Sequence, residues 1–172
     1  IGPRLFVRGR TVRALDGQER YLLAAVDVTS GAPEAWAPLV FAPTSQHIDL
    51  VPNGTRLYIG RVLSAELLRR SHLAAVNTIT GAVLPFDPGS RGVAAPIPPV
   101  TALAVNGQYL FAGTSQSQIR RVGLATGLSD GWGVVTSATG HLRGSVSTLV
   151  ATPTTLYAGG YFNAASTSSQ PQ

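Results

Sequence analysis

The sequence predicts an all-β repeat protein, and three observations favour this fold class. One short phrase recurs four times along the chain, and a second phrase recurs three times between its copies. No window shows sustained helical periodicity. The segment 62–76 comes nearest, but its second half aligns with predicted strands in the other copies, so we expect a loop followed by a strand. With 172 residues, 44% of them hydrophobic, the chain is large enough to bury a core.

The first phrase, a leucine followed by an aromatic residue, predicts the second strand of each unit. Its copies begin at Leu5, Leu57, Leu110 and Leu156, with spacings of 52, 53 and 46 residues. β-Branched and aromatic residues favour strands. Apolar alternating stretches precede three of the copies and predict a first strand at 47–51, 100–105 and 146–151. Asn53-Gly54 and Asn106-Gly107 are strong hairpin signals, and we expect positive φ at both central positions of each turn.

The second phrase predicts the third and fourth strands of each unit. It covers 23–36, 73–86 and 119–132, and in each copy a glycine is followed five residues later by a large aromatic residue. The glycine marks a turn after the third strand. The aromatic residue, which is Trp36, Phe86 or Trp132, belongs to the fourth strand, which ends at proline in the first two copies. We expect these aromatic residues to be part of the core.

Four short antiparallel strands repeated at this spacing are typical of a β-propeller blade. A small twisted sheet cannot bury both of its faces alone, whereas sheets stacked around an axis cover one another. The sequence therefore predicts β-propeller-type repeats over 1–162, with units starting near Leu5, Leu57, Leu110 and Leu156. We expect 163–172, which is rich in Ser, Thr and Gln, to be a tail or linker.

About three and a half units are present, whereas closed propellers have roughly four to eight blades. We expect the chain to be part of a larger propeller, with additional blades outside it. Two alternatives stay open. Several chains could complete a ring together or lie against a partner, or the strands could close into a sandwich.

The segment 5–31 resembles the bacterial delta-60 and related propeller repeats, and the resemblance extends over most of 5–162. Arg20 and Arg70 each fall three residues before the third strand, as the arginine of that pattern does. Asp27 and Asn77 stand at its aspartate position, and "YAGGYF" at 157–162 matches its glycine phrase. The resemblance implies an extracytoplasmic bacterial protein, secreted, periplasmic or at the cell surface. It implies no catalytic residue.

The sequence departs from that pattern at several arginines. Arg8 and Arg61 stand where the pattern has glycine, and Arg120 and Arg121 stand where the other copies have small residues. These departures indicate that the units do not each carry the same ligand site.

Composition excludes several kinds of chemistry. The chain has no cysteine, which excludes disulfides and zinc–thiolate sites. Its three histidines and eight acidic residues match no metal, nucleotide or nucleophile motif, so we expect no metal, no cofactor and no catalytic residues. The net charge of +5 comes from arginines spread along the chain, which argues against nucleic-acid binding. The apolar runs are too short for membrane insertion.

We expect a non-catalytic scaffold that mediates protein–protein interaction or assembly. Arg20 and Arg70 are candidate anion ligands, although a structural role that bridges strand-end carbonyls or Asp27 is favoured. The alternative is a carbohydrate-binding or glycan-processing propeller, in which Tyr109, Tyr157 or Tyr161 stacks on sugar rings. A further alternative is an enzyme whose acidic residues converge in a central channel.

Overall fold

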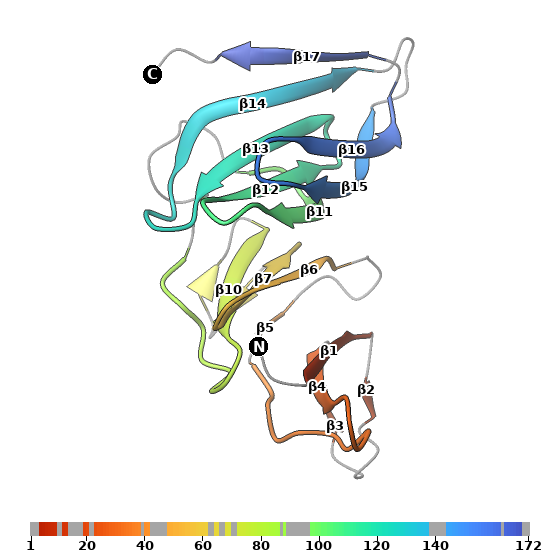
Figure 1. Ribbon diagram of the computed structural model, residues 1–172, viewed down its shortest axis with the longest axis vertical. Helices are drawn as coiled ribbons and strands as arrows, with labels where there is room; N and C mark the ends of the chain where they lie inside the picture. The colour runs from red at the N-terminus through yellow and green to blue at the C-terminus, as the bar shows by residue number, and fades with distance from the viewer. Residues whose placement is uncertain are drawn as a thin grey trace.

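The computed structural model confirms that the protein is all-β and built from antiparallel sheets (Figure 1). It describes residues 4–9, 12–13, 19–20, 23–38, 40–41, 48–61, 64–65, 68–69, 72–86, 88, 97–137, 144–162 and 164–169. These residues contain 17 strands and no helix.

Four sheets, numbered here in chain order, contain the longer strands. Sheet 1 pairs β1 (Arg4–Arg8) with β4 (Leu23–Asp27). Sheet 2 has the order β6 (Leu50–Asn53), β7 (Arg56–Gly60), β10 (Leu73–Asn77). Sheet 3 has the order β11 (Val100–Val105), β12 (Tyr109–Thr114), β13 (Gln118–Gly123), β14 (Ser129–Ser137), β17 (Ala164–Ser169). Sheet 4 pairs β15 (Ser145–Ala151) with β16 (Leu156–Tyr161).

Short strands form two further sheets. One pairs β2 (Val12–Arg13) with β3 (Glu19–Arg20). The other has the order β5 (Val40–Phe41), β8 (Ser64–Ala65), β9 (Leu68–Arg69).

The two sequence phrases form strands where we expected them. The first phrase supplies β1, β7, β12 and β16, and the second phrase begins with β4, β10 and β13. In sheets 1, 2 and 3 these strands pair in the same register, in which Arg4 lies opposite Asp27, Arg56 opposite Asn77, and Tyr109 opposite Gly123.

Among the described residues, the expected fourth strand forms only in sheet 3, where β14 contains Trp132. After the third strands of sheets 1 and 2, the chain makes single bridges, Val26 to Pro33 and Val76 to Val83, and then bends. Proline has no N–H to donate, which limits ladder formation beyond Pro33. Four strands in chain order therefore occur in one sheet of the described residues.

Part of the segment 163–172, which the sequence predicts to be a tail or linker, forms a strand. Ala164–Ser169 forms β17, which pairs antiparallel with β14, from Ser137 opposite Ala164 to Trp132 opposite Ser169. Among the described residues, β17 is the edge strand of sheet 3, since it pairs with β14 alone. β8 pairs with β5 in a comparable way. In both cases a segment that follows a second strand, β7 or β16, pairs with the chain at or after the aromatic residue of the preceding copy, which is Trp36 or Trp132.

The two glycine hairpins differ from the expected turn. Gly54 and Gly107 have φ of 58° and 83°, but neither asparagine has positive φ. Asn53 pairs with Arg56, so the two central residues of the first turn are Gly54 and Thr55. Positive φ at the first central position alone is the property of a type II′ turn. Asparagine instead precedes the turn.

Three hydrophobic clusters lie between successive sheets. In sheet 2, alternation along β7 sends Leu57 and Ile59 to the cluster shared with sheet 1, and Tyr58 to the cluster shared with sheet 3. Sheet 3 likewise shares its second face with sheet 4, through Phe111 and Val146. Trp36 and Phe86 are buried core residues, as expected.

The sheets approach one another closely at their first strands. A Cβ added to Gly60 would lie 2.9 Å from Val100 Cγ1, and one added to Gly113 would lie 2.5 Å from Val146 Cγ1. The Asp49 carboxylate, at the start of sheet 2, also accepts a hydrogen bond of 2.6 Å from the Leu103 N–H of sheet 3. The glycine of the first phrase thus makes room for the first strand of the following sheet.

Candidate functional site

The structure describes three of the five candidate site residues in atomic detail. Tyr109 is half-buried on β12, and Tyr157 and Tyr161 are 60% and 58% exposed on β16. Arg20 lies in β3, but its side chain is outside the described residues, as is all of Arg70.

Arg121 joins Tyr109 to Trp132 on one face of sheet 3, in what we call the Arg121 cluster (Tyr109, Arg121, Asp130 and Trp132). The Arg121 guanidinium carbon lies 4.4 Å from the centroid of the Tyr109 ring and 5.1 Å from that of Trp132. Its Nε donates a 2.9 Å hydrogen bond to Asp130 Oδ2, and its Nη2 forms an ion pair with the same oxygen. The arginine is therefore held in one orientation by two rings and a carboxylate.

The adjoining strands fix the members of this cluster. Tyr109 lies opposite Gly123, so the neighbouring residue of β13 carries no side chain there. Phe111 packs edge-on against Trp132, with centroids 5.7 Å apart. Asp130 also accepts a 3.1 Å hydrogen bond from the Trp132 N–H, which orients its carboxylate toward Arg121.

The chemistry around Asp130 keeps its carboxyl group ionised. Partial burial acts to raise its pKa, but the hydrogen bonds from Arg121 and the Trp132 amide, with the Arg121 charge, lower the pKa below its ordinary value. Asp130 therefore carries its negative charge across the physiological pH range, and the pair with Arg121 persists.

A cleft of about 960 Å³ opens beside this cluster, where the hairpin turns of sheets 2 and 3 meet. Tyr109 and Asp130 belong to its lining, as do the turn residues Gly54, Gly107 and Thr126. Its volume is within the range of ligand-binding clefts. The Arg121 cluster and this cleft together form the candidate binding site.

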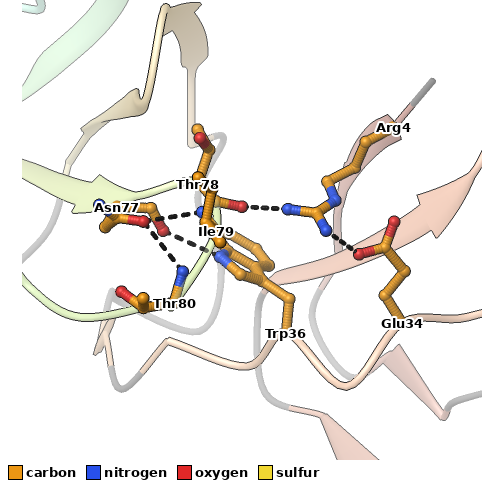
Figure 2. Close-up of polar contacts among 7 residues, drawn as sticks. All are labelled: Arg4, Glu34, Trp36, Asn77, Thr78, Ile79 and Thr80. Carbon is orange, nitrogen blue, oxygen red and sulfur yellow. Dashed lines mark hydrogen bonds and ion pairs between the residues drawn. The ribbon is translucent and has the colours of Figure 1, made fainter. Parts of the chain in front are cut away.

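Two other arginines link neighbouring sheets, and sequence reasoning did not select them. Arg4 donates to the carbonyl of Thr78 and forms an ion pair with Glu34 (Figure 2). Arg56 donates a 2.9 Å hydrogen bond to the carbonyl of Leu124. Their shared position could have identified them from the sequence, because each arginine directly precedes a copy of the first phrase.

Trp36 and Asn77 complete the contact between sheets 1 and 2. Trp36 Nε1 donates a 3.0 Å hydrogen bond to the Asn77 carbonyl, while Asn77 Oδ1 accepts from the backbone N–H groups of Ile79 and Thr80 (Figure 2). Asp27 makes the corresponding turn contacts with Thr29 and Ser30. Hydrogen bonds from Ser30 are the main cause that lowers the pKa of Asp27. The side chain at this position, Asp27 or Asn77, thus stabilises the turn that follows the third strand.

No group of three or more His, Asp or Glu side chains that could hold a metal ion occurs among the described residues. His47 and His141 lie outside them. No helix that is long and apolar enough to cross a membrane is present in the described part of the chain.

Comparisons with known proteins show a similarity of fold and identify no family. No family model matches the sequence, and no curated protein matches it. The structure is similar to the crystal structure of the computationally designed Ika4 protein, with a TM-score of 0.50 and 15% identity, over 86% of this chain and 78% of that one. At that identity the similarity concerns the fold alone.

Proposed function

We propose that the protein is a non-catalytic β-propeller-type scaffold that binds a partner protein through the Arg121 cluster and the adjoining cleft. The single observation that supports the binding role is the cluster itself. Tyr, Trp and Arg are the residues most enriched at interface hot spots. Here one of each is held in a fixed, partly exposed arrangement, so a partner would lose little side-chain entropy on binding.

The propeller arrangement is supported by the way successive sheets meet. The first strand of sheet 3, β11, contacts the first strands of both neighbours, β6 and β15. Sheets that fan around an axis approach one another most closely at their inner strands. A crystal structure of a longer form with the sheets stacked in parallel, without a common axis, would contradict this arrangement.

An extracytoplasmic location and kinship with delta-60 repeats are also part of the proposal, and they rest on the sequence phrases. Fractionation of the natural host cells tests the location. Recovery of the protein in the cytoplasmic fraction alone would exclude it.

A peptide-display selection tests the binding role. Peptides selected on the wild-type protein should bind the Arg121→Ala and Trp132→Ala variants at least roughly 30-fold more weakly, the loss typical of a hot spot. Ile79→Ala is the matched control, since Ile79 is an exposed apolar residue of another turn, at 67% exposure. Selected peptides that bind the variants as well as the wild type would refute the role, as would a selection that yields no binder.

Carbohydrate binding is a second candidate because Tyr157 and Tyr161 are both exposed on β16. They are four residues apart, which places them on the same face about 13 Å apart. Two rings at that distance could stack on two sugars of one chain. A glycan array tests this candidate, and a bound glycan should lose affinity in Tyr161→Ala.

A further inference from the structure

The end of sheet 2 that is farther from the cleft carries two basic residues side by side. Arg61 follows β7 and His72 precedes β10, and the Arg61 N–H donates a 2.6 Å hydrogen bond to the His72 carbonyl. They continue the antiparallel pairing of β7 with β10 by one step. The cleft beside the Arg121 cluster is lined by the opposite end of β7, at Arg56 and the turn before it. Arg61 and His72 therefore lie outside the proposed partner-binding site.

Both residues adopt a backbone conformation that favours glycine. The φ of Arg61 is 64° and that of His72 is 60°, in the left-handed region. Histidine tolerates this region better than most residues, whereas an arginine there costs conformational free energy. The first and fourth copies of the first phrase have glycine at the position of Arg61, as Gly9 and Gly160. The backbone therefore gives no reason for an arginine at position 61, so the contribution of Arg61 comes from its side chain.

The side chains of Arg61 and His72 each place an unpaired nitrogen inside the protein. Arg61 Nε and His72 Nδ1 are two of the three buried side-chain nitrogen or oxygen atoms of the described residues that have no hydrogen-bond partner. A buried donor that lacks an acceptor loses the hydrogen bonds that water would make and gains none in return. Two such atoms on adjacent residues indicate a common acceptor that the described residues do not supply.

Asp49, an acidic residue at this end of sheet 2, is engaged with backbone groups. Its carbonyl accepts a 2.9 Å hydrogen bond from the Gly60 N–H. Its carboxylate accepts hydrogen bonds of 3.1 Å from the Leu50 N–H and 2.6 Å from the Leu103 N–H. No acidic side chain in the described part of the chain forms an ion pair with Arg61. The charge of Arg61 is therefore not balanced by these acidic side chains.

The electrostatics of the two side chains favour the binding of a negative charge. Burial lowers the pKa of Arg61 below its ordinary value, and burial, followed by the charge of Arg61, lowers the pKa of His72. His72 is therefore neutral at pH 7.5, and the pair carries a single positive charge on Arg61. One singly charged anion would balance that charge.

We infer that Arg61 and His72 form an oxyanion-binding site whose ligand is a carboxylate. Arg61 would donate to it from Nε, and His72 would donate from Nδ1 in the tautomer that carries its proton there. A carboxylate matches the single charge and offers two oxygens to the two donors. The inference does not rest on the proposed partner-binding role, because it uses neither the Arg121 cluster nor the cleft.

A titration with acetate tests the site. The isotope-labelled chain is followed by NMR at pH 7.5 while sodium chloride is replaced by sodium acetate at constant ionic strength. The signals of the Arg61 Nε–H and the His72 ring should shift and then saturate. Arg61→Gly should weaken acetate binding at least about tenfold and His72→Gly about threefold, because each removes one donor and the first also removes the charge. Glycine adopts the observed φ at both positions, so both variants keep the backbone conformation.

Arg8→Gly is the matched control, since it removes an arginine from an exposed position of β1, and it should bind acetate like the wild type. Thermal unfolding supplies a second measurement. In chloride, Arg61→Gly should unfold at the wild-type temperature or above it, because glycine relieves the left-handed backbone. Acetate should raise the unfolding temperature of the wild type and leave that of Arg61→Gly unchanged.

Two results would overturn the site itself. One is acetate binding that is absent from the wild type or equally strong in Arg61→Gly. The other is a lower unfolding temperature of Arg61→Gly in chloride, which would show that the arginine supports the fold. Binding of inorganic phosphate without acetate would overturn the carboxylate as the ligand. None of these results would alter peptide binding at the Arg121 cluster, so failure here is distinguishable from failure of the proposed binding role.

Discussion

Tyr58 and Tyr157 occupy the same place in two copies of one phrase, yet Tyr58 is fully buried and Tyr157 is 60% exposed. Both lie on a second strand, between a leucine and a small or branched apolar residue. The difference comes from their neighbours, because sheet 3 covers Tyr58 and nothing in the described structure covers Tyr157. Local sequence therefore determines the strand, and the following sheet determines the contribution of its aromatic residue to stability.

Truncating the two tyrosines should produce the largest difference that tests this comparison. Tyr58→Ala should lower the free energy of unfolding by about 3–5 kcal/mol, since it leaves a cavity in the cluster between sheets 2 and 3. Tyr157→Ala should change it by less than about 0.5 kcal/mol, because the ring of Tyr157 is already exposed. Urea unfolding at low protein concentration measures both, and equal losses would contradict the comparison.

Closing the space between sheets 3 and 4 should have the next largest effect. Gly113→Ala would place a Cβ 2.5 Å from Val146 Cγ1, so β15 must shift, at a cost of about 1–3 kcal/mol. Gly107→Ala is a control for backbone conformation alone, since its φ is 83° and no atom lies within 4 Å of the added Cβ. Thermal unfolding should show loss of the sheet 3–sheet 4 contact in the first variant. In Gly107→Ala, any loss of stability should come from strain in its own turn alone.

Removing the arginine contact between sheets 2 and 3 should cost less. Arg56→Ala deletes the donor to the Leu124 carbonyl and should lower the free energy of unfolding by about 1–2 kcal/mol. Arg8→Ala removes the same charge from an exposed position and should have almost no effect. If both variants lose the same stability in chemical denaturation, the loss reflects net charge and the specific contact has no role.

The smallest effect concerns pH. Burial, followed by the charge of Arg61, lowers the pKa of His72 below its ordinary value, so the folded state prefers neutral imidazole. Stability should therefore fall as the pH drops below about 6.5, the ordinary pKa of histidine, and continue to fall until the pH passes the folded-state value. Because the φ of His72 is 60°, His72→Asn keeps a residue that tolerates this backbone and should reduce the pH dependence. The free energies of unfolding of the wild type and the variant, measured at pH 7.5 and pH 5, check this pH dependence.

Sequence reasoning worked where the determinants are local. The first strand 100–105 follows from the alternation of apolar residues, and the third strand 73–77 follows from the recurrence of the second phrase. The pairing of Ala164–Ser169 with β14 was not predicted, because it depends on which edge of sheet 3 is open in space. Tyr109 was selected as an exposed aromatic residue, but its contacts with Arg121 and Trp132 could not be foreseen. The three residues come from different strands, and the register that aligns them is tertiary.

The order of the strands, their turns and the aromatic residues of the core were determined by the sequence itself, since alternation, glycine and β-branching act within a few residues. Burial was decided only when the sheets came together. Glycine at 60 and at 113 is explained by Val100 and Val146, which lie 40 and 33 residues further along the chain. The exposure of Tyr157 is explained by the lack of a neighbouring sheet in the described structure. The physical reason is that the hydrophobic effect depends on the area removed from water, which no short stretch of sequence specifies.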